Sequence, residues 1–333
     1  MSIDRATRAA AAAYAVSAAA ILSSAGPAAA QQDAATGYPR QPIKIIVGLA
    51  PGAVNDVQSR VIAQKLAERV GQPVVVENRA GAGGNIAAEL VARAAPDGYT
   101  ILNAPTSTLV INPAVSSKLG YDPQKDFVPI TQVSAYPLFL TVSSGLPVNS
   151  VKELLDHAKA NPDKANLATP ATVFDLMTAL LVRNTGAKFV SIPFKSTGEA
   201  MAAILTGQAM IAFTDLNALT PQLKAGKVRA LAGSGPVRLP DAPDIPTVAE
   251  AGYPDAVAVA FTGFVAPKGT PQAIVDRLAR EMNAVLEMPD VIQRWRSMGM
   301  STVKSDSATF GRFIGTEIKR WTDVAKAANI KLD

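Results

Sequence analysis

Short apolar runs alternate with helical hydrophobic patterns along most of the chain. An apolar run at 44–49 precedes apolar residues at helical spacing over 56–70, and the last sixty residues carry helical patterns alone. Strands that alternate with helices are typical of βαβ units around a parallel sheet. The pattern predicts strands at 44–49, 73–77, 99–103, 138–142, 166–169, 189–192, 210–214, 228–233 and 257–265, and helices at 56–70, 85–94, 151–160, 176–184, 198–206, 271–287, 289–298 and 307–328.

The alternation restarts after about residue 140, which predicts two α/β lobes rather than one continuous sheet. The helices after residue 270 have few strands of their own, so we expect them to pack back on the first sheet. Lobe 1 is therefore expected to comprise 38–135 plus 250–333, and lobe 2 to comprise 136–249. Loops at the carboxyl ends of parallel strands would then meet in a cleft between the lobes, where α/β sheets bind ligands.

The N-terminus has the pattern of a secretory signal over residues 1–30. Two arginines precede a small, mildly apolar stretch at 9–22, and Ala28-Ala29-Ala30 fits an A-x-A cleavage site. Cleavage there would leave Gln31 at the mature N-terminus. The alternative is an uncleaved anchor, but the apolar stretch is shorter than the ~18 residues that a membrane helix needs.

Composition excludes several classes of function. The chain has 333 residues, 48% of them hydrophobic, a net charge of +5, no cysteine and one histidine. Lysine and arginine are scattered rather than interleaved with aromatics, so nucleic-acid binding is not indicated. One histidine without cysteine makes a zinc site improbable, and we expect neither metal nor cofactor.

No sequence motif supplies enzyme chemistry. Neither a G-x-S-x-G elbow nor a P-loop occurs, and His157 lies on a predicted amphipathic helix where solvation is the simpler role. The run 81–85, GAGGN, lacks the third glycine of a dinucleotide loop because Ile86 stands there. A turn before a helix capped by Asn85 is the structural interpretation of this run.

The segment 50–56, APGAVND, joins the first predicted strand to the first predicted helix. At such a junction backbone N–H groups without helical partners can bind an anion. We expect Asn55 to cap the helix, with Gln58 completing a capping box. The segment would then bind a carboxylate through its main-chain amides, and its expected site residues are Ala50, Pro51, Gly52, Ala53, Val54, Asn55 and Asp56.

Asp56 has two interpretations from the sequence. A negative charge in the first helical turn suits the helix dipole, which would be a structural role. Alternatively, the carboxylate accepts hydrogen bonds from the ligand, from ordered water or from the opposite lobe. The residues alone leave both open.

Several separate blocks of the chain are similar to those of one protein family. They include Tyr38-Pro39-x-x-Pro42-Ile43-Lys44, the segment 50–56, Gly71–Arg79, Gly81–Asn85, Ala95–Thr100, Tyr121–Phe127, Ser150–Leu154 and Pro246–Gly252. Together they cover essentially all of the chain after the signal. The sequence therefore resembles the Bug receptors of tripartite tricarboxylate transporters.

The resemblance implies a two-lobed, type II-like periplasmic-binding fold with the ligand in the interdomain cleft. It implies an organic acid as ligand, with one carboxylate held by the segment 50–56 and bridging waters. Thr106 and Ser107 match a second binding segment, and Asp215 matches an acid that faces the cleft in many members. Family receptors deliver their ligand to separate membrane permease subunits and have no catalytic activity.

Two positions depart from the family pattern. Ala53 stands where a second glycine is usual, and 169–175, TPATVFD, replaces a longer glycine-rich loop that ends in histidine. The replacement brings a stiffer and more apolar wall, hydroxyl donors and Asp175. Asp175 would repel a second carboxylate if it faced the cleft, or it would simply start the next helix. The expected binding residues of this segment are Thr169, Ala171, Thr172 and Phe174, with the aromatic ring toward the ligand.

We therefore expect a monomeric periplasmic receptor that captures a small carboxylate, a dicarboxylate or an aromatic acid, for a membrane permease. A receptor that acts mainly through a sensor protein is the alternative. An enzyme is a third and weaker reading, because no residue pattern supplies a nucleophile or a base.

Overall fold

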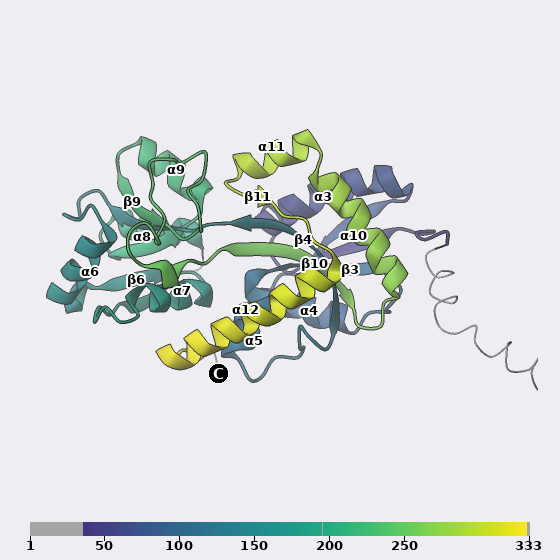
Figure 1. The fold of residues 1–333 in the computed structure, drawn as a ribbon, viewed down its shortest axis with the longest axis horizontal. Coiled ribbons are helices and arrows are strands. Elements are labelled where there is room, and N and C mark those ends of the chain that lie inside the picture. The colour runs from purple at the N-terminus through teal and green to yellow at the C-terminus, as the bar shows by residue number, and fades with distance from the viewer. Residues whose placement is uncertain (1–35, 195, 332–333) are drawn as a thin grey trace, which may run out of the picture.

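The computed structural model describes residues 36–194 and 196–331, so the predicted signal at 1–30 lies outside the described residues. Two sheets organise the fold and lie side by side in Figure 1, each with helices on both faces. Sheet A has the strand order β11-β4-β10-β3-β1-β2, and sheet B has the order β7-β6-β8-β5-β9. The two α/β lobes predicted by the restarting pattern are present.

Sheet A forms lobe 1 and mixes parallel with antiparallel pairs. β1 lies between its parallel neighbours β2 and β3, and β10 runs antiparallel between β3 and β4. The strand pattern predicted a return crossing near 257–265, and β10 is that strand. The strands are β1 (Ile43–Val47), β2 (Val74–Asn78), β3 (Thr100–Pro105), β4 (Phe127–Tyr136), β10 (Ala260–Pro267) and β11 (Ser301–Thr302).

Lobe 1 has two helical layers because its buried strands present apolar side chains to both faces. Ile45 and Val47 pack with α3, α10 and α11, while Ile46 packs on the opposite side with α4 and α12. The helices after residue 270 thus pack back on the first sheet, as predicted. The helices of this lobe are α3 (Val54–Val70), η1 (Ala82–Gly84), α4 (Asn85–Ala92), η2 (Ser107–Ile111, one π-helical turn), α5 (Asn112–Val115), α10 (Gln272–Leu286), α11 (Pro289–Ser297) and α12 (Ser307–Ala328).

Sheet B forms lobe 2 in the same way, with alternate residues on opposite faces. Leu140 and Val142 pack with α6 and α7, whereas Phe139 packs with α8 and α9. β6 and β8 are parallel neighbours, so their carboxyl ends share one edge of the sheet. The elements are β5 (Phe139–Ser143), α6 (Val151–Ala160), η3 (Pro162–Lys164), β6 (Asn166–Thr169), α7 (Thr172–Val182), β7 (Val190–Pro193), α8 (Thr197–Leu205), β8 (Ile211–Thr214), α9 (Leu216–Lys224) and β9 (Val228–Gly233).

The chain crosses between the lobes from β4 to β5 and again from β9 to β10, with η4 (Pro254–Ala256) in the second crossing. Ser234, fully buried, joins the two crossings. Its hydroxyl accepts a hydrogen bond from the Leu138 amide at 2.9 Å and donates to the Ala258 carbonyl at 2.6 Å. The crossings therefore form one bonded hinge rather than two independent strands.

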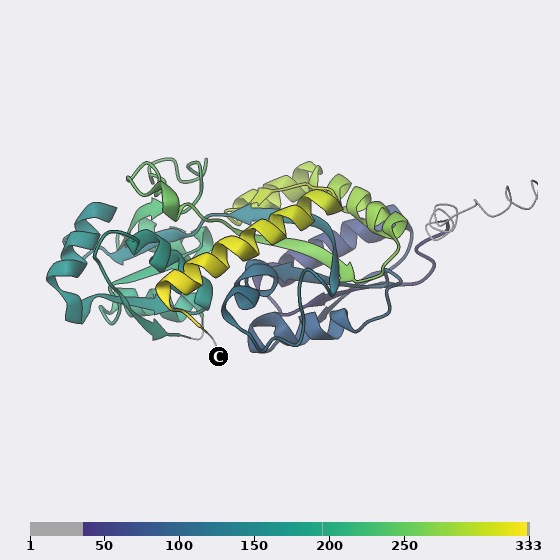
Figure 2. The same ribbon diagram turned by 60° about the horizontal axis from the view of Figure 1, so that its bottom comes forward.

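Helix α12 bridges the lobes on one side of the molecule. It packs against β4 and η2 of lobe 1, and it also packs against α7 of lobe 2. In Figure 2 it runs in yellow across the front of both lobes. Its apolar residues belong to a cluster that continues from sheet A into lobe 2, which includes Phe310, Trp321 and Leu180.

Candidate functional site

The exposed part of the segment 50–56 is a tight turn between β1 and α3. The Ala53 amide donates to the Ala50 carbonyl at 3.2 Å, and Gly52 has a φ of +85°, a left-handed conformation that favours glycine. Ala50, Pro51 and Gly52 are exposed, and Ala53 and Val54 are half-buried. The turn leads directly into the positive end of a 17-residue helix.

The capping role predicted for Asn55 is wrong. α3 begins at Val54 with Ala53 as its N-cap, so Asn55 already lies inside the helix. Its buried side-chain amide donates to Oδ1 of Asn103, a residue inside β3, at 3.0 Å. Gln58 is not part of a capping box either: its side chain is buried and bonds to the Ser134 hydroxyl at 2.8 Å. Burial beside polar groups of distant strands outweighed the local capping preference.

Asp56 is 3% exposed, and its main partners, Gly52 and Arg60, come from the preceding turn and from its own helix. The Gly52 amide donates to Oδ2 at 2.9 Å, and Arg60 reaches both carboxylate oxygens, with Nε 3.0 Å from Oδ2 and Nη2 2.9 Å from Oδ1. Burial acts to raise the pKa of Asp56, but the hydrogen bonds from Arg60 and Gly52 outweigh it and hold this pKa below its usual value. Of the two interpretations from the sequence, these contacts favour the structural one.

Thr106 and Ser107 follow β3 at the same sheet edge as the segment 50–56, because β1 and β3 are parallel neighbours. The Thr106 hydroxyl is buried and occupied: it donates to the Phe261 carbonyl at 3.0 Å and accepts from the Phe261 amide at 2.6 Å. Ser107 is half-buried and begins the π-helical turn η2. Ser107 is therefore the more accessible of the two predicted donors.

The segment 169–175 is mostly helix rather than loop. α7 begins at Thr172 instead of near residue 176, with Ala171 as an N-cap that makes no side-chain bond. Ala171 is exposed and Thr172 half-buried, whereas Phe174 is 7% exposed and belongs to the apolar core. The expectation that the Phe174 ring faces the ligand is thus wrong, because the first turn of α7 turns this ring inward.

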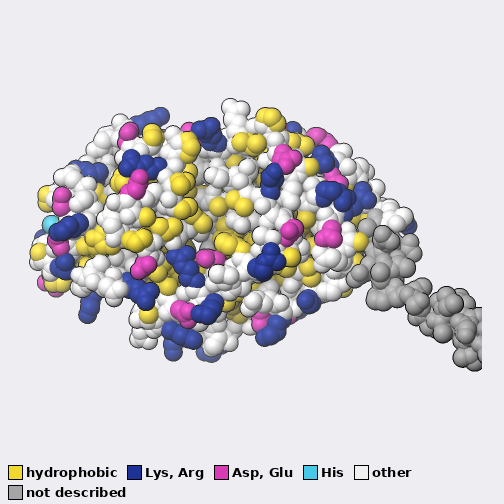
Figure 3. Space-filling view, in the orientation of Figure 1, with side chains coloured by type: hydrophobic (Ala, Val, Ile, Leu, Met, Phe, Trp, Pro, Cys, Tyr) yellow, Lys and Arg dark blue, Asp and Glu magenta, His cyan; other side chains and the backbone are white. Residues whose placement is uncertain are grey.

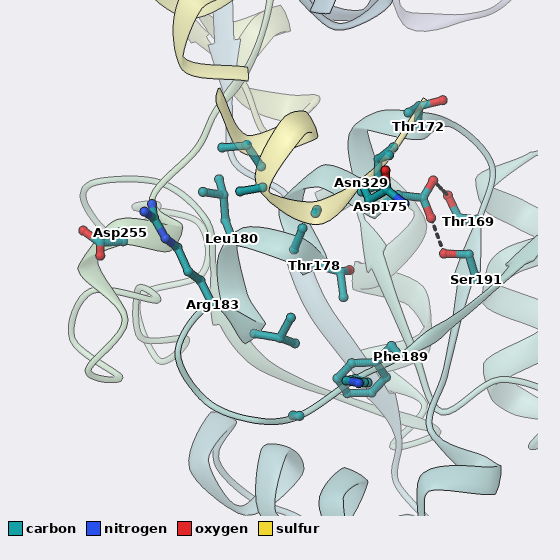
Figure 4. A pocket seen from close by; sticks show the side chains of 18 of the residues that line it. Thr169, Thr172, Asp175, Thr178, Leu180, Arg183, Phe189, Ser191, Asp255 and Asn329 are labelled. Atoms are coloured by element: carbon teal, nitrogen blue, oxygen red, sulfur yellow. Dashed lines mark hydrogen bonds between the residues drawn. The ribbon is translucent and has the colours of Figure 1, made fainter. Parts of the chain in front are cut away.

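Asp175 lies in the first turn of α7 and accepts hydrogen bonds from two hydroxyls. Thr169 Oγ1 donates to Oδ2 at 3.0 Å, and Ser191 of β7 donates to Oδ1, as the dashed lines in Figure 4 show. Within residues 36–194 and 196–331 no cationic side chain forms an ion pair with it. Burial raises the pKa of Asp175, and the two hydroxyl bonds offset this only in part.

Asp215 follows β8 and shares the carboxyl edge of sheet B with the segment after β6. It is the N-cap of α9, and its Oδ1 accepts from the Ala218 amide at 3.0 Å. Its charge contributes, after burial, to raising the pKa of Tyr136 to about 12. Tyr136 ends β4 just before the first crossing, so Asp215 lies close to the hinge.

A cavity of about 1390 Å³ separates α7 and β7 of lobe 2 from the last turns of α12 (Figure 4). Thr169, Thr172 and Asp175 line it from lobe 2. The segment 50–56 does not line it. The predicted residues therefore fall into two groups, one at the carboxyl edge of each sheet.

The side chains that hold the predicted residues in place were not predicted from the sequence. Arg60 was detectable, because an acid and an arginine at i and i+4 pair on a helix. Asn78, Asn103 and Ser191 gave no local signal, since each acts across strands that only the fold brings together. One further prediction was wrong, because Asn85 is the first residue of α4 rather than its cap. His157 lies on α6, the predicted helix, and is half-buried.

The described residues contain no group of three or more His, Cys, Asp or Glu side chains that could hold a metal ion. Among the same residues no helix is both long and apolar enough to cross a membrane. Figure 3 shows acidic and basic side chains intermixed over one face, without a field of a single sign. These findings concern only residues 36–194 and 196–331.

Two α/β lobes joined by a two-strand hinge, with loops at the carboxyl edge of each sheet, define a periplasmic binding protein. The family model described as "Tripartite tricarboxylate transporter family receptor" matches residues 58–330. The chain therefore belongs to the tripartite tricarboxylate transporter receptor family.

Relatives in this family cover nearly the whole chain. Protein BugT of Bordetella pertussis is 35% identical over 298 residues, which are 89% of this chain and 91% of that protein. The solved structure of R. palustris Rpa4515 with adipate is 32% identical in sequence, has a TM-score of 0.79, and matches over 88% of this chain and 99% of that one. The structure of MatC from Rhodopseudomonas palustris with bound malate is also 32% identical, has a TM-score of 0.76, and matches over 86% of this chain and 99% of that one. The family and these structural neighbours are solute-binding proteins rather than enzymes.

Proposed function

We propose that this protein is an extracytoplasmic receptor that captures a small organic carboxylate between its lobes for a tripartite tricarboxylate-type transporter. The observation that carries the proposal is the exposed turn at 50–53, which leads into the positive end of α3 at the carboxyl edge of sheet A. Adipate and malate, bound by two similar structures, support a carboxylate as the ligand class.

Ligand capture is proposed to use both edges of the cleft. The amides of Gly52, Ala53 and Val54 were the expected donors, but the first two have acceptors within the turn and its helix. We therefore assign the carboxylate to the first-turn amides of α3, which have no acceptor inside the helix, with Ser107 beside them. Thr172 and Asp215 would face the ligand from lobe 2, at the edge where β6 and β8 end.

Calorimetry with the purified receptor tests this function. The first ligands are adipate, malate, citrate and benzoate, with neutral adipamide as the matched control. Adipamide has the length of adipate but no charge, so a carboxylate site binds the acid and not the diamide. Equal binding of adipate and adipamide, or binding of none of the acids, would contradict a carboxylate receptor.

Delivery to permease subunits is the proposed role of the closed, ligand-loaded form, since lobe closure signals occupancy. Ligand-dependent uptake by proteoliposomes that contain the permease subunits would support transport. A receptor that instead co-purifies with a sensor protein only in the presence of ligand would support the signalling alternative. Recovery of the ligand unchanged after long incubation would distinguish a transport or signalling receptor from an enzyme.

The proposed location is the periplasm, with the protein cleaved to Gln31 and monomeric. Intact-mass measurement of the exported protein tests the cleavage site, and light scattering tests the monomer. Retention of Met1 on the exported form, or a dimer at micromolar concentration, would contradict these two statements respectively.

A further inference from the structure

The proposed carboxylate site at the start of α3 contains an acid of its own, Asp56, whose negative charge would repel the ligand. Asp56 is almost fully buried, and its Oδ2 is 2.9 Å from the Gly52 amide in the turn itself. A like charge this close to a bound carboxylate costs free energy, most of all where solvent is excluded. The turn can accept an anion only if the charge of Asp56 is compensated.

Arg60 provides the compensation from one helical turn further along α3. Its guanidinium donates a hydrogen bond from Nε to Oδ2 of Asp56 at 3.0 Å, and its Nη2 lies 2.9 Å from Oδ1 as an ion pair without hydrogen-bond geometry. Asp56 and Arg60 together carry no net charge, so the positive helix end remains the main local field. The side chain of Arg60 is 53% exposed, so its packing contributes little to the core.

The same arginine also connects the two ends of the turn. Arg60 Nη2 donates to Asn78 Oδ1 at 3.1 Å, and Asn78 Nδ2 donates to the Leu49 carbonyl at 3.0 Å. Through Asp56 it orients the acceptor of the Gly52 amide. Main-chain groups on both sides of the exposed turn are thus fixed by one network centred on Arg60.

We propose that Arg60 is a positioning residue for ligand capture: it cancels the charge of Asp56 and fixes the carboxylate-binding turn before the ligand arrives. This inference rests on the proposed function. It assigns no ligand contact to the side chains of Arg60 and Asp56, and it explains why an acid is tolerated inside an anion site.

A double-mutant cycle tests the compensation. The variants are Arg60→Gln, Asp56→Asn, the two combined, and Arg93→Gln as a matched control that breaks the exposed Glu89–Arg93 pair on α4. Calorimetry uses adipate, or whichever of malate and citrate binds the wild type more tightly. We expect Arg60→Gln to weaken binding about 10-fold, the double variant to recover to within about 3-fold of wild type, and Arg93→Gln to change nothing.

Recovery in the double variant is the result that a purely packing role would not give. A double variant as weak as Arg60→Gln, or weaker, would overturn the charge compensation. Amide hydrogen exchange at Gly52 measures the turn without any ligand: Arg60→Gln should speed it about 10-fold, and unchanged exchange would overturn the positioning. If none of the acids binds the wild type while Gly52 exchange responds as expected, the proposed function has failed and the network has not.

Discussion

Asp56 and Asp175 occupy equivalent places in the two lobes but have opposite electrostatic surroundings. Each lies in the first turn of the helix that follows a strand at the carboxyl edge of its sheet. Asp56 is ion-paired with Arg60, and its pKa is lowered. Asp175 accepts hydrogen bonds from the hydroxyls of Thr169 and Ser191, and burial raises its pKa.

A charge in the first helical turn therefore does not by itself decide whether the site binds or repels an anion. Both acids lie near the positive end of a helix, so their opposite pKa shifts come from the burial of Asp175 and from the bonds of Asp56 to Arg60 and Gly52. Asp56 is paired with a cation, whereas Asp175 has no ion-pair partner within residues 36–194 and 196–331. The charge of Asp175 would weaken binding of a second carboxylate near it, so we expect an uncharged or cationic end group to bind more tightly there than the second carboxylate of a dicarboxylate.

The largest expected effect comes from breaking the lobe 1 turn. Gly52→Pro removes the amide that binds Asp56 and excludes the φ of +85°, so we expect a loss of adipate affinity of about 100-fold. Gly207→Pro is the matched control, because Gly207 is also exposed, has a φ of +75° and donates its amide to the Ile204 carbonyl. Calorimetry and circular dichroism measure both variants. Equal affinity loss in the two would show that the effect is not specific to the turn.

A smaller effect is expected from removing the charge in lobe 2. Asp175→Asn should tighten adipate about 5-fold while it weakens 6-aminohexanoate, which has the same length but a cationic end. Asp255→Asn, which lines the other end of the α7–α12 cavity, is the control and should change neither ligand. Competition calorimetry gives the ratio of the two affinities. An unchanged ratio in Asp175→Asn would mean that this acid has only its structural bonds to Thr169 and Ser191.

The smallest effect is expected in the pH dependence of stability, and it has opposite signs for the two acids. Asp56 has a lowered pKa when folded, so its contribution is present above the ordinary Asp pKa and is lost as pH falls through the folded value. Asp175 has a raised pKa when folded. The free energy of unfolding therefore falls as pH rises from the ordinary Asp pKa through the raised pKa of the folded state. Urea unfolding from pH 3 to 7 should show Asp56→Asn losing stability at neutral pH and Asp175→Asn gaining it. A stability change of the same sign in both variants would contradict the opposite pKa shifts of Asp56 and Asp175.

The sequence predicted most elements because their hydrophobic periods are clear. β9 and α12 match their predicted ranges, and α6, predicted at 151–160, has Ser150 as its N-cap, with Ser150 Oγ accepting from the Glu153 amide at 3.1 Å. β4 was missed because polar residues interrupt its apolar pattern. Its Thr131 and Ser134 are fully buried, and their partners, such as Ser305 and Thr262, are more than 100 residues away.

The candidate site was harder to predict for the same physical reason. The turn at 50–53 and the sheet edges followed from local patterns, but the bonding of each polar side chain depended on the tertiary fold. Asn55 bonds to Asn103, 48 residues away, rather than capping its own helix. Asp215 caps α9, a helix that the sequence did not predict because Pro221 interrupts its pattern.

The course of α12 has a practical consequence for measuring occupancy. The sequence contains no cysteine, so a single introduced thiol is the only site for a thiol-reactive dye. Ala328, exposed in the last turn of α12 and lining the cavity against α7, places such a dye where the two lobes meet. A dye at Ala328→Cys would sense a change in lobe spacing as a change in fluorescence, which would turn this receptor into an optical sensor for its own ligand.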